Sequence, residues 1–118
     1  MRLDKREQVA FINQLVELAK SDGNIDSSEA EIILEYAEKH SEAYYLSKWI
    51  TNDEAEETLA LMPMAKKIHV LNELERLSLS DGYLSFQEIT KVLHIAKVLG
   101  IDTNLVVEHY KSEVYADV

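Results

Sequence analysis

Apolar residues recur every three or four positions along most of this chain, which is the spacing of one face of an α-helix. Strict alternation of apolar and polar residues, the pattern of a half-buried strand, never persists. The spacing predicts helices at about residues 4–20, 27–40, 42–50, 51–61, 64–79 and 86–99, with a last one from about 103. Because the connections are short, we predict an all-α fold, a compact bundle of about six to seven helices in a single domain over residues 1–118.

The apolar stripes of these helices identify the positions that we expect to face the core. In the two longest helices Leu15 and Leu74 are expected to be buried. Elsewhere the same periodicity predicts inward-facing side chains at Leu34, Leu46, Trp49, Ile68 and Leu105. Aromatic residues also gather between positions 36 and 49, where they either fill the core between the two halves of the chain or form a binding face for a partner.

One nine-residue segment occurs twice. The sequence SDGNIDSSE at residues 21–29 returns as SDGYLSFQE at residues 80–88, an offset of 59 residues. The offset also aligns apolar positions outside the segment, and it places Leu15 over Leu74. We therefore predict two copies of a helix–DG turn–helix unit, at about residues 4–40 and 64–100, related by an approximate two-fold axis.

Helix termination and restart explain most of the repeated turn. Gly23 stands where a left-handed residue would end the first helix, a conformation that glycine adopts at little cost. Asp26 is the expected N-cap of the next helix, with Glu29 at the reciprocal position of a capping box. Ser85 and Glu88 take the same two roles in the second copy. The capping interpretation assigns no role to the aspartate that precedes each glycine.

A cation site is the second interpretation of the turns. The spacing D-G-x-[IL]-x-x-x-E matches the second half of an EF-hand loop, but apolar residues or Lys20 occupy the upstream ligand positions. Two complete calcium-sensor loops are therefore excluded. Partial sets of oxygen ligands remain, which could hold a divalent cation such as calcium. The candidate metal ligands are Asp22, Asp26 and Glu29 in the first turn, with Asn24 beside them, and Asp81 and Glu88 in the second, with Ser85 beside them.

Charge and cysteine content narrow the possible functions. The net charge of −10 argues against nucleic-acid binding, which needs clustered Lys and Arg. Most of the excess acidity lies in residues 1–60, which could attract cations or a basic partner surface. The absence of cysteine excludes disulfides and thiolate catalysis. Because the chain has no apolar run of ~18–20 residues and no signal-like N-terminus, we expect no direct membrane span and a cytoplasmic location.

The sequence shows no catalytic pattern. The four histidines are His40, His69, His94 and His109, and none belongs to an H-E-x-x-H or E-x-x-H motif. There is no glycine-rich phosphate loop and no G-x-S-x-G. We therefore predict that the protein is not an enzyme. The alternative is a metal-dependent hydrolase that holds its metal at the acidic turns.

Two segments give the chain a resemblance to a known family over residues 8–101. They are A-K-S-D-G-N-I-D-S-S-E and L-S-D-G-Y-L-S-F-Q-E, and I-A-K-V-L-G-I follows the second. The chain resembles the TerB-like (tellurite-resistance) family, which includes the domain of the membrane-anchored J-domain co-chaperones DjlA. The resemblance implies an all-helical, duplicated core with acidic residues proposed to bind metal ions. The positions that match are Asp22, Glu29, Asp81 and Glu88. It also implies an interaction module in bacterial stress responses, often near membrane complexes.

We accordingly expect a non-catalytic, cytoplasmic stress-response module of TerB-like type that acts through a protein partner. A membrane-associated stress complex is the partner that the resemblance favours, and a divalent cation at the turns would tune the contact. The alternative is a purely structural or adaptor domain whose DG turns only reverse the chain.

Overall fold

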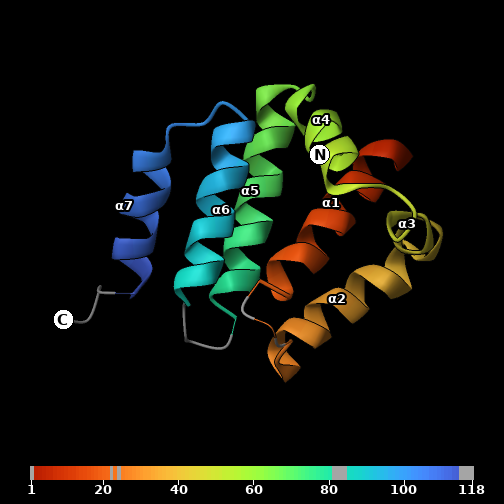
Figure 1. Ribbon diagram of the computed structural model, residues 1–118, viewed down its shortest axis with the longest axis horizontal. Helices are drawn as coiled ribbons and strands as arrows, with labels where there is room; N and C mark the ends of the chain where they lie inside the picture. Colours follow the sequence, from red (N-terminus) through yellow and green to blue (C-terminus); the bar gives the residue numbers. More distant parts are fainter. Residues whose placement is uncertain (1, 22, 24, 81–84, 115–118) are drawn as a thin grey trace.

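The computed structural model describes residues 2–21, 23, 25–80 and 85–114, and the side chains of these residues up to 111 (Figure 1). The described residues form helices and no strand, which confirms the predicted all-α bundle of six to seven helices. The helices are α1 (Lys5–Ala19), α2 (Ser27–Lys39), α3 (Ser41–Ser47), α4 (Asn52–Ala60), α5 (Met64–Ser78), α6 (Phe86–Val98) and α7 (Thr103–Val114).

The sequence repeat is visible in the helix boundaries. Helices α1 and α5 each have 15 residues, and α2 and α6 each have 13. The first residues of α1 and α5, Lys5 and Met64, stand 59 positions apart, as do the first residues of α2 and α6. Leu15 and Leu74 are both fully buried, as predicted. The two copies of the motif therefore build helix pairs of the same lengths at the same 59-residue offset.

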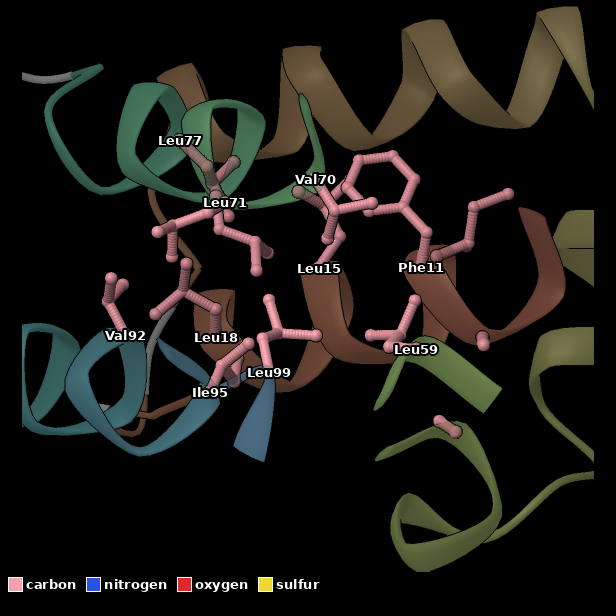
Figure 2. Close-up of a cluster of buried hydrophobic side chains, with 14 of the residues drawn as sticks. Phe11, Leu15, Leu18, Leu59, Val70, Leu71, Leu77, Val92, Ile95 and Leu99 are labelled. Carbon is pink, nitrogen blue, oxygen red and sulfur yellow. The ribbon is translucent and has the colours of Figure 1, made fainter. Parts of the chain in front are cut away.

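Helix α1 lies at the centre of the molecule and packs against α2, α3, α4, α5 and α6. It can do so because apolar or small residues extend around most of its circumference, and ten of its 15 residues are buried. In the core, side chains of α1 meet those of α4, α5 and α6, and Figure 2 shows this contact with Phe11, Leu15, Leu18, Leu59, Val70, Leu71, Val92 and Ile95.

Helix α7 is peripheral. It packs mainly on α6, and Figure 1 shows it at the edge of the bundle, beside α6 and away from α2 and α3. Only Val106 and Tyr110 are buried among its described side chains. Gly100, with φ at +75°, ends the preceding helix as the sequence predicted.

Several of the predicted inward-facing positions are wrong. Leu34 is 57% exposed and Trp49 is 73% exposed, and Leu46, Ile68 and Leu105 are also on the surface. The reason is that the outer helices bury only a narrow stripe. Helix α2 buries Ile32 and Ile33 instead of Leu34, and the two-turn α3 ends at Ser47, before Trp49.

The aromatic residues between positions 36 and 49 divide between two environments. Tyr36 and Tyr44 pack against the core, and the ring of Tyr36 meets that of Phe11 edge-on at 5.1 Å between centroids. Tyr45 and Trp49 face outward together, with their ring centroids 6.3 Å apart. The core-filling interpretation therefore holds for Tyr36 and Tyr44, whereas Tyr45 and Trp49 take no part in the core.

Candidate functional site

The first turn is built as the capping interpretation predicts. Gly23 has φ at +90°, and its amide donates to the carbonyl of Lys20 at 2.9 Å. Asp26 Oδ1 accepts from the amide of Glu29 at 2.8 Å, and Glu29 Oε1 accepts from the amide of Asp26 at 3.3 Å. This capping box satisfies two amides at the start of α2. It uses only one oxygen of the Glu29 carboxyl group.

The second turn places Ser85 where the first places Asp26. Ser85 Oγ accepts from the amide of Glu88 at 3.0 Å and lies 3.1 Å from Glu88 Oε1, to which it donates. Both side chains are buried. The N-caps of α2 and α6 are thus confirmed at Asp26 and Ser85.

Glu29 and Glu88 form a pair of buried acidic groups. Glu29 is 2% exposed and Glu88 is 3% exposed, although both begin helices at the ends of the two hairpins. Burial raises the pKa of Glu29 from an ordinary 4.5 to about 8. The hydrogen bond from the Asp26 amide opposes the shift, while the negative charges of Glu88 and Asp26 add to it. The fold therefore brings together the two glutamates that the 59-residue offset relates.

One atom of this pair stands out. Glu29 Oε2 is buried and has no hydrogen-bond partner among the residues that the structure describes. An unpaired buried carboxylate oxygen is costly, and a proton or a bound cation would remove much of that cost. The pair can thus share a proton, or it can offer oxygen ligands to a positive ion.

The remaining candidate ligands divide between described and undescribed parts of the chain. Asp22, Asn24 and Asp81 lie outside the described residues. Within the described ranges, no group of three histidine, aspartate or glutamate side chains is close enough to hold a metal ion. The structure therefore brings together Glu29 and Glu88, with Asp26 close enough to act on Glu29.

A buried polar layer next to this pair was not predicted. Tyr110 on α7 and Ser78 on α5 form a hydrogen bond of 2.7 Å between their hydroxyls, and Nε2 of His109 lies 2.9 Å from Oε2 of Glu75. Burial raises the pKa of Glu75, against the effect of His109. Burial also raises the pKa of Tyr110, and the charges of Glu75 and Glu88 raise it further.

The polar layer joins α7 to Ser78 and Glu75 of α5. The helical periodicity could have indicated it, because Glu75 and Ser78 lie next to Leu74 and Leu77 on a stripe that is otherwise apolar. Tyr110 itself was assigned to the last helix, but nothing in the sequence pairs it with a residue 32 positions earlier.

Comparisons with known proteins support the fold. The chain is similar to a solved structure of a protein of unknown function from Porphyromonas gingivalis W83, with 20% sequence identity and a TM-score of 0.74. The match covers 95% of this chain and 98% of that one. At this level of identity the likeness shows the fold alone. The sequence matches no protein-family model and no curated protein.

No helix in the described part of the chain is both long enough and apolar enough to cross a lipid bilayer.

Proposed function

We propose that this chain is a non-catalytic, cytoplasmic interaction module of TerB-like type that binds a divalent cation, such as calcium, at its paired turns. The observation that carries the cation part is the buried Oε2 of Glu29, which lacks a hydrogen-bond partner in the described part of the chain and lies within the field of Glu88. A cation between these carboxylates would supply the missing partner and cancel their repulsion. Asp22 and Asp81 are the acidic residues of the turns that would complete the ligand set.

The interaction part of the proposal is supported by the exposed aromatic pair. Tyr45 and Trp49 are held side by side on the surface, with the partly exposed Leu46 between them in sequence. Exposed tryptophan and tyrosine are typical of the residues that dominate binding energy at protein interfaces. The protein partner would be a component of a bacterial stress-response complex, as the TerB resemblance implies.

An adaptor domain without a metal is the second candidate function. It is favoured by the capping box of Asp26 and Glu29, which explains the first turn without any ion. A metal-dependent hydrolase is the third, and it would need an open coordination position next to a substrate pocket.

A cation titration separates the first two candidates. Calcium, magnesium and manganese are added to 10 mM at pH 7.5, and the melting temperature and the amide NMR spectrum are recorded. We expect one ion to raise the melting temperature, since an ion that binds only the folded state stabilises it. Asp22→Asn and Glu29→Gln should each abolish the rise. Glu31→Gln removes the same charge from the exposed face of α2 and should preserve it.

If none of the three ions moves the wild-type melting curve or spectrum, the cation site is excluded and the adaptor function stands. The partner contact is tested separately. A photo-crosslinking amino acid in place of Tyr45 should capture one defined protein in the native cell, and the same group in place of the exposed Leu105 should not. Equal capture at both positions would contradict the proposed face.

A further inference from the structure

A cleft of about 430 Å³ lies at the opposite end of α2 from the buried glutamates. It is formed where the segment before α1, the first half of α1, the end of α2 and the middle of α5 meet. Its lining residues are Arg2, Leu3, Gln8, Phe11, Ile12, Tyr36, His40 and His69. A volume of this size is in the range of small-molecule sites.

The floor of the cleft is apolar and rigid. Leu3, Phe11 and Ile12 belong to the buried core. Tyr36 forms one wall, and its ring is fixed from two sides, by the edge-on contact with Phe11 and by a stacked contact with His40 at 6.4 Å. Its hydroxyl donates to Glu73 Oε2 at 2.7 Å, so the phenol cannot turn into the cleft. The apolar surface is therefore preformed, and a ligand would not have to order it.

The polar groups of the cleft are mostly nitrogen donors. Arg2 contributes a guanidinium, and His40 and His69 contribute imidazoles from two different helical units. Neither imidazole has a hydrogen-bond or ion-pair partner among the residues that the structure describes, unlike His94 and His109, which pair with glutamates. Gln8 is already engaged, because its Nε2 donates to the carbonyl of Leu3 at 3.0 Å.

The acid whose charge acts on His69 is Glu73, and it is ion-paired with Arg76. Glu73 accepts hydrogen bonds from Tyr36 and from Nε and Nη2 of Arg76, at 2.7, 3.0 and 2.9 Å. Burial alone would raise the pKa of Glu73, but these bonds outweigh it, and His69 lowers the pKa further. All three bonds reach the same oxygen, Oε2, and two of them come from the guanidinium of Arg76, which offsets the negative charge of Glu73. A chain of net charge −10 consequently carries one cleft whose available side-chain groups would attract a negative charge.

We propose that this cleft binds a small organic acid, with its carboxylate between His40, His69 and Arg2 and its apolar body on Leu3, Phe11 and Ile12. One carboxylate matches the nitrogen groups that line the cleft, and a ring or a short alkyl chain matches its apolar residues and its volume. The site is separate from the paired turns, so its test is independent of the proposed cation.

The experiment is an NMR titration of the ¹⁵N-labelled 118-residue chain at pH 6.0. Hexanoate and phenylacetate are the probes. Acetate keeps the carboxylate without the apolar body, and hexanol keeps the body without the charge. We expect saturable shifts from both probes at Phe11, Tyr36, His40 and His69, and binding at least fivefold weaker for acetate and for hexanol.

Variants then locate the site. His40→Gln and His69→Gln should each weaken hexanoate binding at least fivefold, because each removes one imidazole that would contact the carboxylate. His94→Gln, which changes the exposed histidine paired with Glu56 on the other side of the bundle, is the matched control and should leave binding unchanged. Amide spectra of the variants without ligand show whether they fold. If one variant does not fold, the other variant and the comparisons with acetate and hexanol test the proposal.

Absence of saturable shifts up to 10 mM of both acids would overturn the proposal. The proposal would also fail if the affinity for hexanoate exceeded that for acetate or for hexanol by less than fivefold. It would fail as well if His40→Gln and His69→Gln weakened hexanoate binding by less than fivefold.

Discussion

Replacing Glu29 by glutamine should make the stability of this protein less sensitive to pH. The amide keeps an acceptor oxygen for the Asp26 amide, so the capping box survives, and it cannot ionise. In the wild type the pKa of Glu29 is raised from 4.5 to about 8 in the folded state. The folded protein therefore retains a proton that the unfolded chain loses above pH 4.5.

The sign follows from this difference in proton binding. When folding raises the pKa of a group, the stability that this group contributes is fully present below its pKa in the unfolded chain. That stability is lost as the pH rises through its pKa in the folded protein. At about 1.4 kcal/mol per pKa unit, the loss from Glu29 is on the order of 4 kcal/mol at pH 8, most of it between pH 5 and 8. Because Glu29 is almost completely buried, solvent screening does little to reduce this figure.

The assay is urea unfolding followed by circular dichroism at pH 5, 6, 7 and 8 in a chelator-treated buffer. We expect Glu29→Gln to equal the wild type within about 1 kcal/mol at pH 5 and to exceed it by several kcal/mol at pH 8. Glu31→Gln is the matched control, since Glu31 is exposed in the same turn of α2. Glu75 and Glu73 titrate in both the variants and the wild type, so the comparison isolates Glu29. Parallel pH profiles for the wild type and both variants would refute the proposed burial and repulsion of Glu29.

Three further predictions concern stability and are measured by urea unfolding at pH 6. Asp26→Ala and Ser85→Ala should each lower the free energy of unfolding by about 0.5–2 kcal/mol, because each removes an N-cap. Unchanged urea midpoints in both variants would contradict the capping geometry. Leu15→Ala and Leu74→Ala should each cost about 2–5 kcal/mol because both leave cavities in a fully buried layer, and a large effect in only one would show that the two hairpins are not equivalent. Tyr110→Phe should lower the free energy of unfolding by about 1–3 kcal/mol, because it removes the hydroxyl that is hydrogen-bonded to Ser78. Amide hydrogen exchange should become faster in α7 than in the other helices, and a uniform increase would contradict a local role for Tyr110.

Local rules in the sequence predicted the framework of this fold. Helical periodicity predicted the helices, Gly100 predicted where α6 ends, and cap chemistry predicted where α2 and α6 begin. Gly23 does not end α1, which stops at Ala19 with its C-cap at Lys20. These features depend on neighbours within about four residues, so they can be read along the chain. The 59-residue repeat added one long-range fact, that Leu15 and Leu74 occupy equivalent buried positions.

Other features depend on which helix faces which, and only the tertiary structure decided them. Leu34 and Trp49 lie outside because α2 and α3 are peripheral, and periodicity alone cannot say how wide a stripe a helix will bury. The same holds for the polar groups. Glu29 becomes a buried acid near Glu88, and His69 comes to line a cleft with residues of α1 and α2, because packing brings together side chains that are far apart in the sequence.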